Sequence, residues 1–139
     1  MTRDAERRTS PLALAPGGTF SRSSRVRHRR EFTRIQSAGI RARAHAFTVV
    51  ALHQARTEAR LGCAISKRVG NAVVRNRVRR LLREIFRRVS AELPPVDFVI
   101  IANPPAAELA FKGLEAVYSE LGPILVEVGR KAEKRGPKR

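Results

Sequence analysis

The chain has 139 residues, with 29 Lys and Arg against 12 Asp and Glu, and its formal charge is +17. That length favours one domain, and so much positive charge favours a polyanionic partner, because self-repulsion otherwise destabilises the compact state. A membrane-surface helix would need an apolar face rich in Trp or Phe, and the chain has no Trp. We therefore expect a nucleic-acid-binding protein with no membrane partner.

The first half of the chain predicts one helix and two strands. Residues 1–20 show no sustained hydrophobic period and predict a flexible tail. Residues 28–39 have apolar side chains at helical spacing and stop at Gly39, which predicts a short helix. Residues 44–52 and 60–66 predict two strands, with Phe47 in the core, joined by a turn as an antiparallel hairpin.

The second half predicts a long helix, a strand and a last helix. Residues 73–93 form the clearest element, which Pro94 and Pro95 close. Residues 97–102 (DFVIIA) predict a buried strand, and residues 106–128 a final helix that Gly122 and Pro123 could bend. Residues 131–139 predict a basic tail. The order α-β-β-α-β-α indicates a single α/β (α+β) sandwich domain over residues 21–130.

The helix at 73–93 separates apolar and cationic side chains onto opposite sides. Its apolar sector contains Val74, Val78, Leu81, Leu82, Ile85 and Val89. Asn76, Arg79, Arg80, Arg83 and Arg87 lie opposite, with Arg75 and Arg77 on the flanks. A solvated charged face would mix both signs, whereas this face is almost entirely Arg, which binds phosphate bidentately and stacks on bases. Glu84 is expected to pair with arginines of the same helix.

The segment that leads into this helix has the features of an anion-binding turn. It contains Lys67 and Arg68, Gly70 allows a close approach, and Asn71 is placed as the N-cap.

Residues 61–86, LGCAISKRVGNAVVRNRVRRLLREIF, resemble the signature of the protein component of bacterial ribonuclease P. The matching positions are Gly62, Ser66, Lys67, Arg68, Gly70, Asn71, Ala72, Arg75, Asn76, Arg77, Arg80, Arg83 and Glu84. The other elements agree in order and spacing over residues 25–125, and the tails lie outside the resemblance.

The resemblance implies a fold, a function and partners. The implied fold has a mixed sheet with a left-handed β-α-β crossover, as in a ribosomal protein domain, against the usual right-handed rule. The implied function is that of the non-catalytic, cytoplasmic protein subunit of an endoribonuclease that removes the 5′ leader of precursor tRNA. Mg²⁺ would be held mainly by the catalytic RNA and the substrate. The residues implied to contact the catalytic RNA are Lys67, Arg68, Arg75, Asn76, Arg77, Arg79, Arg80 and Arg83.

The resemblance also implies a cleft for the single-stranded leader between the first helix and the sheet. Its residues would be Phe32, Gln36, Thr48 and Val50. Many family members have an aromatic residue in place of Gln36, some have Tyr in place of Val50, and Asn103 stands where Arg is common. Because base stacking contributes about 1–3 kcal/mol per base, these departures predict weaker or more polar leader recognition. Phe32 suits either the cleft or the core.

Other readings have less support in the sequence. A different RNA-binding module would need the same basic helix but no ribonuclease P RNA. An autonomous nuclease would need clustered carboxylates, yet the aspartates are only Asp4 and Asp97. His28, His45 and His53 lack the spacing of metal ligands, and a DNA-reading helix would need fewer arginines. No protein active site and no obligate protein partner are expected, and the single Cys63 fits a reducing compartment.

Overall fold

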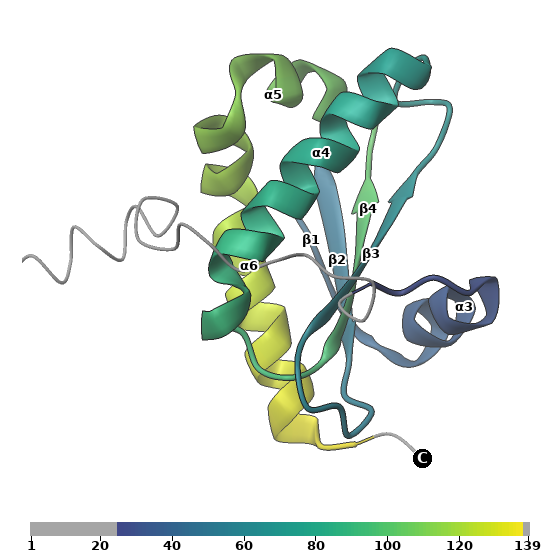
Figure 1. The fold of residues 1–139 in the computed structure, drawn as a ribbon, viewed down its shortest axis with the longest axis vertical. Helices are drawn as coiled ribbons and strands as arrows, with labels where there is room; N and C mark the ends of the chain where they lie inside the picture. The colour runs from purple at the N-terminus through teal and green to yellow at the C-terminus, as the bar shows by residue number, and fades with distance from the viewer. Residues whose placement is uncertain (1–24, 138–139) are drawn as a thin grey trace, which may run out of the picture.

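The computed structural model describes residues 25–137, which form a four-stranded sheet with helices on both faces (Figure 1). In chain order the elements are α3 (Arg29–Ala38), β1 (Ile40–Arg43), β2 (Phe47–Leu52), β3 (Arg60–Ile65), α4 (Ala72–Val89), a 3-10 turn (Ser90–Glu92), β4 (Asp97–Ala102), α5 (Ala106–Lys112) and α6 (Leu114–Arg135). The predicted helix at 28–39, both predicted strands, the long helix and the DFVIIA strand are confirmed. The predicted tail at residues 1–20 lies outside the described residues.

The sheet has the strand order β1-β2-β4-β3. β2 pairs with β1 and β4 antiparallel, and β3 pairs with β4 in parallel. The predicted β2–β3 hairpin is therefore wrong, because β4 lies between these two strands. β4 is apolar on both faces, and a strand of that kind is most stable when strands and helices cover it on every side. The unit β3-α4-β4 is the one for which the family resemblance predicts a left-handed crossover.

β1 was absent from the sequence prediction. It is a four-residue edge strand in which half-buried and exposed residues alternate, with Arg41 and Arg43 exposed. So short a run of alternating Ile, Arg and Ala carries little strand signal, and its pairing with β2 is what defines it.

The main core lies between the sheet and the helices α4, α5 and α6. Phe47, Val49, Phe98 and Ile100 point from β2 and β4 into this core. α4 contributes Val78, Leu82, Ile85, Phe86 and Val89 as buried residues, while Val74 and Leu81 are half-buried beside them. The predicted apolar sector of α4 and the core position of Phe47 are confirmed, and Phe86 extends that sector.

A smaller core lies on the opposite face, beneath α3. Its buried members are Val26, Ile35, Val50, Leu52 and Val99, with Phe32 packed at the side. α3 crosses only part of this face (Figure 1), so the sheet stays accessible toward the carboxyl ends of β3 and β4.

The C-terminal helices differ from the prediction in two ways. The single helix is divided at Gly113, whose φ of 107° lies in the left-handed region that favours glycine. Pro123 instead lies within α6, where the buried Leu121 and Leu125 hold the helix against the sheet. α6 also continues to Arg135 with Ala132 buried, so residues 131–135 are helical rather than part of a tail. Within residues 25–137, no helix combines the length and apolarity that a membrane span requires.

Candidate nucleic-acid interface

The start of α4 is built as the sequence predicts. Asn71 is the N-cap, and its side-chain oxygen accepts a hydrogen bond from the Val74 backbone N–H at 3.0 Å. A Cβ added to Gly70 would lie 2.9 Å from the Val74 side chain, so the close approach requires glycine. Arg75 donates a long hydrogen bond of 3.4 Å to the Gly70 carbonyl, which directs this guanidinium back over the turn.

The exposed side of α4 carries a pocket of about 420 Å³, which we call the α4 pocket. Its lining residues are Arg25, Asn76, Arg79, Arg80, Arg83, Glu84 and Arg87. Four of the eight predicted RNA-contacting residues therefore come together here. Arg79 donates to the Asn76 side-chain oxygen at 2.9 Å, which fixes both groups at the pocket wall. Arg80 is exposed and makes no hydrogen bond or ion pair within residues 25–137.

Glu84 is the acidic member of the α4 pocket, and it is already engaged. Its carboxylate accepts hydrogen bonds from Arg87 at 2.7 Å and from Arg88 at 2.6 Å. The bond from Arg87 is the main cause that lowers the pKa of Glu84. The predicted role of Glu84 as an ion-pair partner is confirmed, and the carboxylate orients two arginines at the far end of the helix face.

A narrower pocket of about 210 Å³ joins α4 to α3. Phe32 lines it from α3, and Arg79 and Arg83 line it from α4, across Gly62 of β3. Burial lowers the pKa of Arg83, and the charges of Arg25 and Arg79 act in the same direction. Burial also raises the pKa of the Cys63 thiol to about 11, against the influence of Arg83 and Arg79. The aromatic ring of Phe32 is thus next to the guanidinium groups of the α4 face.

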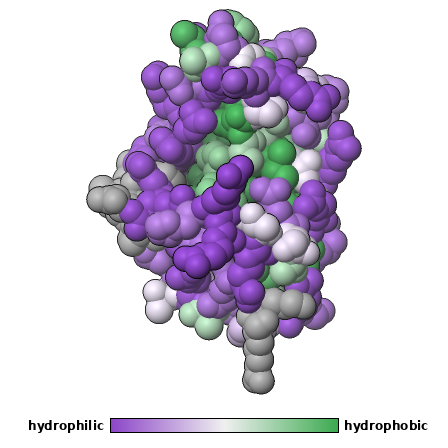
Figure 2. Space-filling view, turned by 90° about the vertical axis from the view of Figure 1, so that its right-hand side faces the viewer, coloured by the Kyte–Doolittle hydropathy of each residue, from purple (hydrophilic) through white to green (hydrophobic). Residues whose placement is uncertain are grey.

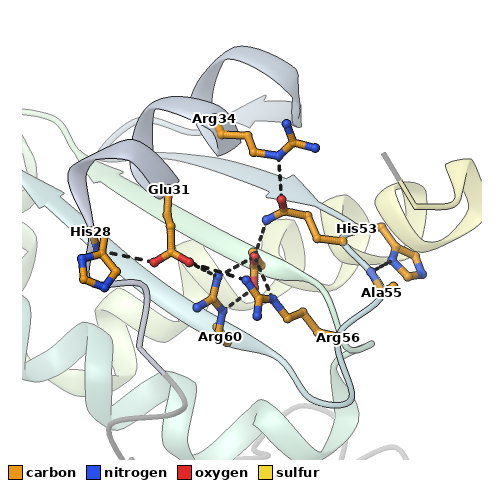
Figure 3. A network of polar contacts seen from close by, with 9 residues as sticks. His28, Glu31, Arg34, His53, Ala55, Arg56 and Arg60 are labelled. Carbon is orange, nitrogen blue, oxygen red and sulfur yellow. Dashed lines mark hydrogen bonds and ion pairs between the residues drawn. The ribbon is translucent and has the colours of Figure 1, made fainter. Parts of the chain in front are cut away.

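The first turn of α3 is joined to the sheet by a set of ion pairs and hydrogen bonds, which we call the Asp97 network (Figure 3). It consists of Glu31, Gln54, Arg56, Arg60 and Asp97. Arg60 donates to both oxygens of the fully buried Asp97, at 2.8 and 2.9 Å, and to Glu31 at 3.0 Å. Gln54 donates a further bond of 2.6 Å to Asp97.

These contacts explain how a carboxylate can be buried in a β-strand, because burial of a charge requires paired donors. They also link Asp97 through Arg60 to Glu31, and so connect the buried end of β4 to the first turn of α3. Arg135 at the end of α6 contributes a second attachment, since its guanidinium donates to the Ala38 carbonyl at the end of α3.

The uncovered part of the sheet forms a depression of about 690 Å³, which we call the sheet hollow. Figure 2 shows this side of the molecule, where apolar surface lies at the bottom of a depression with a hydrophilic rim. Its lining residues are Arg43, His45, Ala64, Ile65, Ser66, Arg68, Ile101, Ala102, Asn103, Pro104 and Pro105. Neither Arg43 nor His45 was among the predicted site residues. The strand that carries Arg43 was itself missed, and His45, within the predicted strand at 44–52, was considered only as a metal ligand.

The four predicted leader residues share one side of the sheet but not one cavity. Thr48 is 7% exposed and lies beside the sheet hollow, where Asn103 donates to its hydroxyl at 3.4 Å. Val50 has no exposed surface and packs beneath α3. Gln36 is half-buried on α3, and its backbone carbonyl accepts a hydrogen bond from the Arg41 guanidinium. Phe32 lines the narrower pocket instead of the sheet hollow. Because Val50 is fully buried, it can shape the site only by packing.

The remaining predicted cations lie around these pockets. Arg68 lines the sheet hollow rather than the α4 pocket. Lys67 is exposed in the turn before α4. Arg77 lies over the Phe111 ring, with 4.7 Å between its guanidinium carbon and the ring centroid. The cationic surface therefore runs from the sheet hollow across the start of α4 to the α4 pocket.

The described carboxylates do not suit a metal site. Within residues 25–137, no three His, Cys, Asp or Glu side chains are grouped as metal ligands. Both oxygens of Asp97 accept hydrogen bonds from Arg60, and Glu31 is paired with the same arginine. Divalent metals such as Mg²⁺ need free carboxylate oxygens or retained waters, and these two groups are committed to guanidinium ions.

The fold and its surface define a small, strongly basic α+β protein with a cationic helix next to an open sheet. The family model described as Ribonuclease P matches residues 20–123. The ribonuclease P protein component of Desulfovibrio desulfuricans is 43% identical over 112 residues, which cover 78% of this chain and 85% of the relative. That of Bacillus velezensis is 37% identical over 94 residues, covering 67% and 81%.

Solved structures agree with these matches. The ribonuclease P protein of Thermotoga maritima, in complex with 1-(4-fluorophenyl)-2-thiourea, superimposes with a TM-score of 0.69 at 28% identity, covering 74% of this chain and 98% of that one. That of Staphylococcus aureus has a TM-score of 0.67 at 28% identity, covering 74% and 96%. The chain belongs to the bacterial ribonuclease P protein family, and the fold class predicted from the resemblance is confirmed.

Proposed function

We propose that the chain is the cytoplasmic protein subunit of the ribonuclease P ribonucleoprotein, which binds the catalytic RNA and the 5′ leader of precursor tRNA and thereby supports leader removal. The α4 pocket carries this proposal, because it gathers Asn76, Arg79, Arg80 and Arg83 on one exposed surface. A folded protein tolerates such charge most readily when a polyanion neutralises it, and Arg forks match phosphate geometry.

The sheet hollow is the proposed path of the leader. A single strand is bound through its phosphates and through stacking or apolar contact with its bases. The hollow offers both, because Arg43 and Arg68 lie around a floor that contains Ala64 and Ile101. Asn103 and Thr48 add a polar pair in the position where the family often has Arg. Leader recognition here therefore depends on cations and amides more than on rings.

The chemistry is proposed to belong to the RNA. Mg²⁺ held by the RNA and the substrate supplies the activated water and neutralises charge at the scissile phosphate. The protein positions the leader and reduces repulsion between the two RNAs, and no protein carboxylate takes part. A protein of this kind lowers the Mg²⁺ concentration that cleavage requires.

The test is cleavage of precursor tRNA at low Mg²⁺ by the cognate ribonuclease P RNA alone, by the protein alone and by both together. We expect strong cleavage only when both are present. Cleavage by the protein alone would make it a nuclease in its own right. Tight binding without stimulation would leave a general RNA-binding protein.

The same assay tests the leader path. Phe32→Ala is expected to reduce the preference for precursor over mature tRNA more than it reduces assembly with the catalytic RNA. An equal loss of both, with the fold retained, would remove Phe32 from leader recognition.

A further inference from the structure

Two of the three large apolar side chains that are exposed in the described residues lie around one arginine of α4. Val73 is 71% exposed and Phe111 is 67% exposed, whereas Val126 on α6 is 39% exposed. Arg77 lies one helical turn after Val73, so the two share a face of α4. Its guanidinium is 4.7 Å from the centroid of the Phe111 ring. Single exposed apolar residues need no explanation, but this cluster combines apolar surface with a stacked cation.

The cluster continues the cationic surface of α4 onto α5. α5 packs beside α4 on the same side of the sheet (Figure 1). Lys112 follows Phe111 and is exposed, and Arg80 is exposed one turn after Arg77. Glu108, one turn before Phe111 on α5, is the exposed acidic neighbour on that helix, and cations outnumber it. A ring within a cationic surface suits a ligand that combines negative charge with flat aromatic groups.

We propose that Phe111 and Arg77 form a stacking platform for an unpaired base of the bound RNA. This inference rests on the proposed function and extends it, because it adds α5 to the RNA-binding surface. Arg planes and aromatic rings both stack on bases, and the Phe111 ring has no donor for a phosphate. The base must be unpaired and unstacked on one side, because bases inside a duplex have both faces covered. An RNA loop or bulge supplies such a base, and Lys112 is placed to meet its phosphate.

The first experiment compares the affinities of four proteins for the cognate ribonuclease P RNA: wild type, Phe111→Ala, Phe111→Leu and Phe111→Trp. We expect Phe111→Ala and Phe111→Leu to weaken binding by about 5- to 150-fold, the range for loss of one stacked base. The dependence of affinity on salt should not change, because no ion contact is lost. Phe111→Trp should bind at least as tightly as wild type. Thermal unfolding of each variant controls for folding, and an exposed side chain should change it little.

The second experiment uses fluorescence. The chain contains no Trp, so Phe111→Trp introduces a single reporter at the platform. A base stacked on the indole should quench its emission when the RNA is added, whereas a fully paired RNA duplex should not. Val126→Trp, at the exposed apolar position of α6 away from this cluster, is the matched control and should not be quenched.

The outcomes separate this inference from the proposed function. If wild-type protein neither binds the RNA nor stimulates cleavage, the proposed function fails and the platform with it. If wild type does both, but Phe111→Ala binds equally well and Phe111→Trp is not quenched, the platform alone is overturned. Sedimentation of the free wild-type and Phe111→Ala proteins tests whether this surface joins two copies of the protein. If Phe111→Ala loses self-association but binds RNA as wild type does, the surface is a contact between protein copies. That result also overturns the inference.

Discussion

The arginine side chains on the exposed face of α4 differ in whether they have interaction partners within the protein. Arg79 is held by Asn76, and Arg77 is stacked on Phe111, whereas Arg80 has no hydrogen bond or ion pair with any residue of the described chain. A guanidinium without protein partners gains most from an added phosphate, because nothing has to be broken first. Arg80 is therefore the position where charge removal tests the interface most directly.

Arg80→Ala is expected to weaken binding to the ribonuclease P RNA. Log affinity decreases linearly with log salt concentration, and loss of one phosphate contact should make this slope less steep by about one unit. The measurement is a binding titration at several salt concentrations. Arg130→Ala, which removes the same charge from an exposed position of α6, is the control. Equal effects of both substitutions would show that bulk charge, and not the α4 pocket, determines affinity.

The Phe32 ring packs directly against Gly62, and this contact is possible because Gly62 has no side chain. A Cβ added to Gly62 would lie 2.7 Å from two atoms of the Phe32 ring. Gly62→Ala should therefore displace the ring and cost about 1–3 kcal/mol of unfolding free energy, as overpacking does. In a Phe32→Ala background the same substitution should cost much less. Urea unfolding of wild type, the two single variants and the double variant measures the coupling energy between Gly62 and Phe32. An equal cost of Gly62→Ala in both backgrounds would contradict the contact.

The position of α3 depends on its packing over the smaller core and on polar contacts at its two ends, more than on its own helical propensity. Ten residues are too few for a stable isolated helix. Glu31 joins its first turn to Arg60 and through it to the buried Asp97, and Arg135 meets its last carbonyl. These contacts therefore set where two of the proposed leader residues, Phe32 and Gln36, lie.

The Asp97 network makes a prediction about pH. Burial acts to raise the pKa of Glu31, but the hydrogen bond and charge of Arg60, together with backbone hydrogen bonds from His28 and Arg27, outweigh it, so the pKa is lowered from its ordinary value of 4.5. A carboxyl whose folded pKa is lowered stabilises the fold above its unfolded pKa, and that stability is lost as the pH falls through the folded value. Relative to Glu31→Gln, wild type should therefore be more stable at pH 7, with a gap that narrows below pH ~4.5.

Urea unfolding at pH 7, 5 and 3.5 measures that gap. Glu127→Gln provides a control at an exposed α6 position, where the carboxylate is 3.6 Å from Lys131. A gap between wild type and Glu31→Gln that stays constant across this range would mean that packing, rather than the ion pair, explains the effect.

The whole molecule carries more positive charge than its own carboxylates can offset. The formal charge of the whole chain is +17, and α4 alone carries seven arginines against one carboxylate, Glu84, which is paired with Arg87 and Arg88. The free protein therefore bears repulsion that a bound anion would relieve. A bound anion is therefore expected to stabilise the fold.

Inorganic tripolyphosphate should raise the melting temperature more than sodium chloride at the same ionic strength. A ligand at 100 times its Kd stabilises by about 2.7 kcal/mol, which corresponds to a rise of several degrees. The Arg80→Ala/Arg83→Ala variant should lose much of this rise. Arg130→Ala/Lys134→Ala has the same net charge and should keep it. If both double variants lose the rise equally, the anion acts on net charge and not at the α4 pocket.

Local patterns in the sequence were sufficient for most of the elements, though not for β1 or for the break at Gly113, and for the amphipathic arrangement of α4. The amphipathic arrangement of α4, the Asn71 cap, the Glu84 pairing and the burial of Phe47 all depend on residues within a few positions of one another, and the structure confirms each. The dense signature at 61–86 was also enough for the family. Which of these residues contact RNA stays a prediction.

Only the tertiary structure decided which distant residues meet. It placed β4 between β2 and β3, buried Val50, joined Arg60 to Asp97, and brought Arg77 onto Phe111. Strand pairing and side-chain contact between elements depend on burying both faces of the most apolar strand at once, which no local period encodes. Composition and periodicity therefore predicted the class of ligand, a polyanion, and the packing around β4 decided where on the surface the candidate binding residues lie.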